Sequence, residues 1–146
     1  MSSDQTDTTA YRTLFRRVIL YKNLADQTEA AHSPKPHLRR ILPERFALSD
    51  ADSASLERLA LAYQGEIGPI HQQAETVIKT FHARFPLGII PHGVDHSPPP
   101  ELKEIQQQED AVALRYRDLL RNSMIEEDFQ KLHTKVLQSF ATPITR

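Results

Sequence analysis

The feature that most constrains this chain is a row of apolar residues with heptad spacing between residues 49 and 85. Its members alternate in steps of four and three residues, the spacing that places side chains on one face of a long helix. They are Leu56, Ala60, Tyr63, Ile67, Ile70, Ala74, Val77 and Phe81. Ser49 precedes this apolar seam as a candidate N-cap, and Asp50 and Asp52 follow it near the positive end of the helix dipole. The pattern predicts one helix of roughly 50 Å.

Three residues inside the predicted helix oppose regular helical structure, namely Gly65, Gly68 and Pro69. A proline removes one hydrogen bond of the helical ladder, and its ring crowds the preceding turn. We therefore expect a kink near Gly65 to Pro69, with a complete break at Pro69 as the alternative.

The segments before the long helix are less regular. Residues 1–8 are polar and lack apolar periodicity, so we expect a disordered leader there. A first helix should begin near Thr8 or Thr9, because either residue can cap it. One face of this helix carries Tyr11, Leu14, Phe15, Val18, Tyr21, Lys22 and Ala25. Residues 36–47 contain two prolines and should form one short helix or two turns.

After the long helix, residues 86–100 contain five prolines and two glycines, a density that predicts an extended linker. A second amphipathic helix should follow at about 100–122. Ser123 and Glu126 have the spacing of a capping box, which predicts the start of a last helix. Residues 142–146 should form a frayed tail.

These elements predict one all-α domain over residues 9–141. We expect an antiparallel helical hairpin or bundle of four to five helices, with the long kinked helix at its centre. The helix at 100–122 should return along the apolar seam, and the first and last helices should cover the ends. The core or interface is expected to contain Leu56, Tyr63, Ile67, Ile70, Val77, Phe81, Val112, Tyr116 and Leu119. Because such a long hairpin leaves apolar area exposed, we expect a homo-oligomer.

Composition excludes several classes of function. The 146 residues carry 18 basic and 19 acidic side chains, and a net charge of −1 argues against a nucleic-acid binder. No apolar run is long enough to span a membrane. The chain has no cysteine, which excludes disulfides and zinc–thiolate sites. The polar N-terminus lacks the features of a signal peptide, so a cytoplasmic protein is expected, with export as the alternative if a leader was removed.

The sharpest candidate site for chemistry is His92, Asp95 and His96 in the proline-rich linker. Two imidazoles and a carboxylate could hold a divalent transition metal. The favoured alternative is a solvated loop with two incidental histidines, because no helix fixes their geometry. No phosphate-binding loop, nucleophile elbow or catalytic triad is present, so we do not expect an enzyme or a bound cofactor.

Basic side chains gather along the first helix and around residues 35–45. They are Arg12, Arg16, Arg17, Lys22, Lys35, His37, Arg39, Arg40 and Arg45. They could form a positive surface for an acidic partner. The favoured interpretation is a set of intramolecular ion pairs with the acidic residues of the long helix.

Two stretches, residues 48–52 (LSDAD) and 122–126 (NSMIE), resemble the repeated L-T-x-x-Q signature of Spy-like periplasmic proteins. In both, serine stands in place of threonine; Asp52 and Glu126 replace glutamine, and Asn122 replaces the first leucine. A generic capping box accounts for the same residues. The resemblance implies a small helical dimer that acts as an ATP-independent chaperone or stress sensor, in some members with bound metal. The chain as a whole also resembles other helical proteins of bacteria.

The sequence therefore favours a non-enzymatic assembly protein that uses an exposed apolar helix seam to bind other proteins. The alternative is a Spy-like periplasmic chaperone or metal-responsive stress protein.

Overall fold

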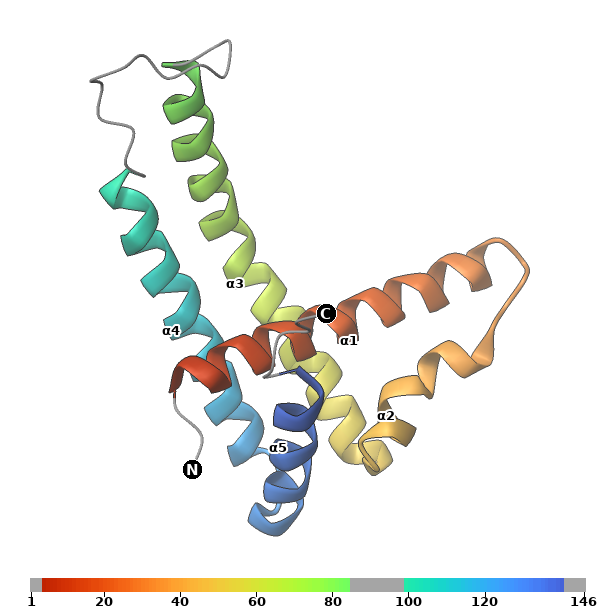
Figure 1. Cartoon of the computed structure of the whole chain (residues 1–146). Coiled ribbons are helices and arrows are strands. Elements are labelled where there is room, and N and C mark those ends of the chain that lie inside the picture. The colour runs from red at the N-terminus through yellow and green to blue at the C-terminus, as the bar shows by residue number, and fades with distance from the viewer. Residues whose placement is uncertain (1–3, 85–98, 141–146) are drawn as a thin grey trace.

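The computed structural model of the chain describes residues 4–84 and 99–140. Within these ranges every regular element is a helix, which confirms the predicted all-α class (Figure 1). In chain order the elements are α1 (Asp4–Ala30), η1 (Pro36–Arg39), α2 (Ile41–Arg45), α3 (Asp50–Ala83), α4 (Pro100–Asn122) and α5 (Glu126–Phe140). The proline-rich linker, apart from its last two residues, and the predicted tail at 142–146 lie outside the described residues.

Helix α3 is the predicted long helix, and it has 34 residues. Ser49 caps it as expected, because its Oγ accepts a hydrogen bond from the Asp52 amide at 3.1 Å. The helix continues through Pro69, so the alternative of a complete break is wrong. The kink near Gly65 to Pro69 stays a prediction.

Helices α3 and α4 form the predicted antiparallel hairpin, and they lie side by side along its length (Figure 1). The apolar seam of α3 is buried only in its first half, at Leu56, Ala60, Tyr63 and Ile67. Beyond Ile67 the same seam is half-buried. We call residues 70–83 of α3 and 100–108 of α4 the hairpin arm.

Helix α1 does not cover an end of this hairpin as expected. It crosses the hairpin and contacts α3, α4, α5 and η1 (Figure 1). The physical reason is its wide apolar face, which is too broad for a single partner helix. Ala10, Tyr11, Leu14 and Phe15 are fully buried, and Val18 and Ile19 continue this face on the next turn.

A cluster of three aromatic rings holds the crossing together. The ring centroid of Phe15 in α1 lies 4.9 Å from that of Tyr63 in α3 and 6.4 Å from that of Tyr116 in α4. Tyr63 and Tyr116 meet edge to face at 5.9 Å. Tilted and edge-to-face rings at these distances attract each other in addition to burying apolar area. One ring of α1 therefore joins both helices of the hairpin.

The first helix begins earlier than expected. It starts at Asp4, and Thr8 is a buried residue inside it whose hydroxyl donates to the Asp4 carbonyl at 2.7 Å. Residues 4–8 are therefore helical and not part of a disordered leader, while residues 1–3 lie outside the described part of the chain.

The predicted capping role of Ser123 is also wrong. Ser123 ends α4, and its Oγ donates to the Leu120 carbonyl at 2.8 Å. Glu126 begins α5 and accepts two hydrogen bonds from Arg121 instead of closing a capping box. A serine hydroxyl can donate as well as accept, so the same residue suits either end of a helix.

Replacement of Phe15 by alanine should lower the free energy of unfolding by about 3–5 kcal/mol, because it empties a fully buried site between three helices. Urea denaturation followed by circular dichroism measures this loss. The matched change Leu119→Ala, at a side chain that is 42% exposed, should have a much smaller effect. Equal losses for the two variants would show that the crossing is not the centre of the core.

Gly65→Ala should raise the free energy of unfolding by up to about 1 kcal/mol, because alanine favours a helix interior over glycine. A Cβ at either Gly65 or Gly68 would meet nothing within 4 Å outside the local backbone. Gly68→Ala should gain less, since a Cβ directly before Pro69 crowds the proline ring. Differential scanning calorimetry compares the two variants, and a larger gain at Gly68 would contradict this explanation.

Candidate functional site

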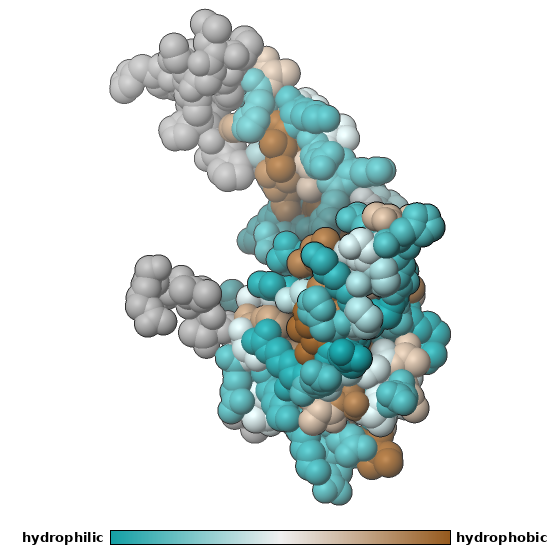
Figure 2. Space-filling model, turned by 90° about the vertical axis from the view of Figure 1, so that its right-hand side faces the viewer, coloured by the Kyte–Doolittle hydropathy of each residue, from teal (hydrophilic) through white to brown (hydrophobic). Residues whose placement is uncertain are grey.

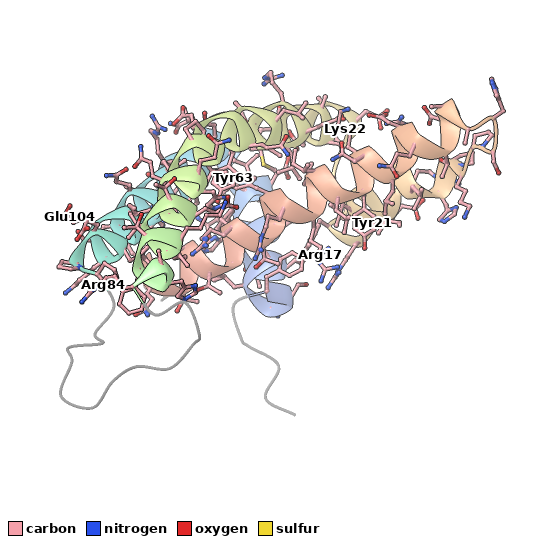
Figure 3. All side chains as sticks on the ribbon, turned by 90° about the horizontal axis from the view of Figure 1, so that it is seen from above. Arg17, Tyr21, Lys22, Tyr63, Arg84 and Glu104 are labelled. Atoms are coloured by element: carbon pink, nitrogen blue, oxygen red, sulfur yellow. The ribbon has the colours of Figure 1, made fainter. Side chains whose placement is uncertain are left out.

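A concave surface lies where α1 diverges from α3. A cavity of about 520 Å³ opens between these helices, and we call it the notch. Its lining includes Arg12, Arg16, Ile19 and Leu20 of α1, and Tyr63, Ile67 and His71 of α3. Seen from above, Tyr63 lies between the two helices, whereas Arg84 and Glu104 mark the far end of the hairpin arm (Figure 3).

Exposed apolar side chains lie in the notch and on the two helices beyond it. On α1, Leu20 is 45% exposed and Leu24, one turn further, is 37% exposed. On the hairpin arm, Ile78 is 40% exposed and continues the same face of α3 as Ile67. A space-filling view shows an apolar stripe on the hairpin arm with hydrophilic residues on both sides (Figure 2). Water therefore contacts apolar side chains along both helices that leave the notch.

The base of the notch also carries charge. Arg12 Nη1 lies 3.8 Å from Asp110 Oδ1, and His71 Nε2 lies 3.6 Å from Glu109 Oε2. Glu109 of α4 is only 8% exposed. Arg16 forms no ion pair with any residue that the structure describes. The α1 wall therefore offers an uncompensated cation beside its leucines.

A buried cluster of polar side chains joins α1 to α4 and α5. Its members are Asp7, Tyr11, Arg117 and His133. Asp7 Oδ2 accepts a hydrogen bond from Arg117 Nη1 at 2.7 Å. The Tyr11 hydroxyl lies 2.7 Å from His133 Nδ1, and burial raises the pKa of Tyr11, so the hydroxyl keeps its proton and can donate. His133 Nε2 lies 3.9 Å from Asp7 Oδ1, which has no hydrogen-bond partner among the described residues.

These buried side chains position α5. Because Tyr11 is fully buried, a substrate cannot reach them past this residue. His133 stacks between two rings, with centroids 5.8 Å from Tyr11 and 5.5 Å from Phe129. Its arrangement therefore suits a structural contact between helices better than a catalytic one.

Burial lowers the pKa of His133, so protonation of the folded protein is unfavourable. The unfolded chain, with a histidine pKa of about 6.5, then binds more protons as the pH falls. The stabilising contribution is complete above about pH 6.5 and is lost as the pH falls toward the folded-state pKa.

Urea unfolding at pH 7.5 and pH 5.5 should therefore show a loss of stability at the lower pH that His133→Asn reduces. The asparagine side chain can still accept from Tyr11 but does not titrate. The exposed His37→Asn is the matched control and should behave as the unchanged protein. If both variants lost the same amount of stability between pH 7.5 and pH 5.5, this result would contradict the role of His133.

The residues expected to form the core or interface divide into three groups. Leu56, Tyr63, Ile67 and Tyr116 are buried, and Ile70, Val77, Phe81 and Val112 are half-buried. Leu119 is 42% exposed and lies outside the core of the single chain, where its neighbour Leu120 is fully buried. Its place in an interface stays a prediction.

The predicted metal ligands His92, Asp95 and His96 lie outside the described residues. In the parts of the chain that the structure describes, no group of three or more histidine, aspartate and glutamate side chains could hold a metal ion. None of the helices over residues 4–84 and 99–140 is long and apolar enough to cross a membrane.

Four of the nine basic residues, namely Arg12, Lys22, Arg39 and Arg40, form ion pairs among the described residues. None of the four pairs with the long helix, so the favoured interpretation is wrong about the partner. Arg39 pairs with Asp26 and Glu29 of α1, each at 2.7 Å. Lys22 also pairs with Asp26, at 2.6 Å.

Sequence reasoning missed Leu20, Leu24 and Ile78, which lie outside the predicted seams. The spacing of Leu20 and Leu24, four residues apart on a helix, was a signal of a second apolar stripe. Nothing in the sequence pattern places that stripe opposite Ile78.

Comparison with known proteins gives no relative: no family model, no curated protein and no solved structure matches the chain. Of the two stretches that resemble the Spy-like signature, residues 48–52 begin a helix, whereas residues 122–126 span the turn between α4 and α5.

Proposed function

We propose that this chain is a non-enzymatic interaction protein that self-associates, with the hairpin arm of each copy seated in the notch of the other. The observation that carries the proposal is the exposed apolar surface along the two helices that leave the notch. Leu20 and Leu24 on α1 and Ile78 on α3 all contact water in the single chain. Burial of such surfaces is the main driving force of association.

The charges of the two walls are complementary. Arg16 lies beside Leu20 on the α1 wall. Glu75 is exposed on the hairpin arm, one turn before Ile78. Neither side chain has an ion-pair partner within the described ranges. When the arm of one copy enters the notch of another, Glu75 can meet Arg16 while Ile78 meets the two leucines.

A second copy suits this surface better than an unrelated partner, because each chain carries both halves of the contact. Two-fold symmetry makes the arrangement isologous: the arm of the first copy enters the notch of the second, and the reverse contact forms at the same time. Each interaction therefore occurs twice, and the assembly closes at two chains.

Sedimentation velocity over a wide range of concentrations tests the proposal. The unchanged chain should sediment as a dimer at high concentration, and Ile78→Glu should sediment as a monomer, since it places a charge in the apolar contact. Ile125→Glu is the matched control: Ile125 is 72% exposed in the α4–α5 turn, away from the notch, and its variant should remain a dimer.

A charge-reversal pair sharpens the test. Arg16→Glu and Glu75→Arg should each weaken the dimer, and the double variant should recover part of the loss. A monomer at all concentrations, or equal effects of Ile78→Glu and Ile125→Glu, would contradict the proposal. The Spy-like alternative would instead predict that the chain suppresses the aggregation of an unfolded client protein.

A further inference from the structure

A second cavity lies away from the notch, between the other face of α1, the η1–α2 segment and the start of α3. Its volume is about 330 Å³, which is within the range of small-molecule sites. The apolar part of its lining comes from Val18, Leu38, Leu42, Pro43, Leu48 and Leu56. Four successive elements therefore enclose an apolar space that a small ligand can enter.

The segment that covers this cavity is held in place at both ends. His32 and Ala47, which flank residues 33–46, have positive φ angles of 59° and 53°. Left-handed backbone at a residue other than glycine is unfavourable and persists only where the surroundings enforce it. Arg39 ties the segment to Asp26 and Glu29 of α1. The cover is a fixed part of the fold, with backbone strain at both of its ends.

Some of the charged groups around the cavity have ion-pair partners, and others do not. Its cations already have carboxylate partners: Lys22 and Arg39 bind Asp26, and Arg40 lies 3.7 Å from Glu44. Lys22 lies on the side of α1 that faces the start of α3 (Figure 3). An added anion would compete with these ion pairs.

The opposite wall, on α3, presents groups that have no such partners. Asp50, Ser53 and Glu57 follow at steps of three and four residues, so they share one face of the helix, and all three line the cavity. Ser53 Oγ is buried and has no hydrogen-bond partner in the described part of the chain. Neither Asp50 nor Glu57 forms an ion pair with a described residue.

We propose that this cavity binds an amine with an apolar body. The ammonium group binds Glu57 and Asp50 and donates a hydrogen bond to Ser53 Oγ, which satisfies the buried hydroxyl. The alkyl or aromatic body occupies the space lined by Leu42, Leu48 and the other apolar residues. A cationic head group complements the free carboxylates without disturbing the ion pairs on α1.

Isothermal titration calorimetry of the full chain with three probes of equal chain length tests the charge of the ligand. The probes are n-octylamine, n-octanol and n-octanoate, which share the apolar body and differ in the head group. Octylamine should bind at least fivefold more tightly than octanol, and octanoate should bind least. Equal or tighter binding of octanoate, or no binding of octylamine, would overturn the proposal.

Variants test the position of the site. Glu57→Gln should weaken octylamine binding at least fivefold and leave octanol binding unchanged. Glu104→Gln is the matched control, because Glu104 lies at the far end of the hairpin arm, and it should leave all binding unchanged (Figure 3). Circular dichroism confirms that both variants stay folded. Octylamine binding that is insensitive to Glu57→Gln would place the amine elsewhere and contradict the assignment.

Discussion

The contact on which the rest of the structure depends is that of Phe15 with Tyr63 and Tyr116. An antiparallel pair of helices alone buries one apolar seam and leaves two faces in water, so its core is thin. The ring of Phe15 enters between the two helices of the hairpin and is fully buried there. It fixes where α1 crosses, and α5 then packs against α1 and α4 on the same side of the crossing. The three rings therefore join α1 and the hairpin into one domain.

The crossing also decides where the molecule keeps apolar surface exposed. Burial is concentrated near Phe15, and it decreases along α3 from Ile67 toward the hairpin arm. On α1, Leu20 and Leu24 are exposed on one face beyond Ile19, while Ala25 is still fully buried. The two helices leave the crossing in different directions (Figure 1), and the notch lies between them. Fold and proposed contact surface therefore follow from one packing arrangement.

Much of the secondary structure could be predicted from the sequence, because it depends on local signals. The Ser49 cap and the seam of α3 identify that helix, and the bounds of α4 agree with the prediction. Periodicity identifies a buried face but not the helix that covers it, so the crossing of α1 could not be predicted. Ser123 shows a second limit, because the same hydroxyl can end one helix or begin the next.

Leu119 was expected in the core or interface. It is exposed in the single chain, and its place in an interface stays a prediction. A heptad seam drifts by about 20° per heptad around a straight α-helix, which has 3.6 residues per turn. After Glu109 the buried positions are therefore Ala113, Tyr116 and Leu120. The candidate sites were harder to predict, because the walls of the notch and of the second cavity come from segments far apart in the chain.

Hydrogen–deuterium exchange in the folded protein tests most directly whether the α1 crossing organises the domain. Amides in the buried core should exchange only in global unfolding, and those in weakly packed parts should exchange earlier. The account predicts that residues 11–19 of α1 exchange last, together with residues 56–67 of α3 and 113–120 of α4. Residues 72–82 of the hairpin arm should exchange sooner. Exchange of α1 while the α3–α4 hairpin stays protected would contradict the account.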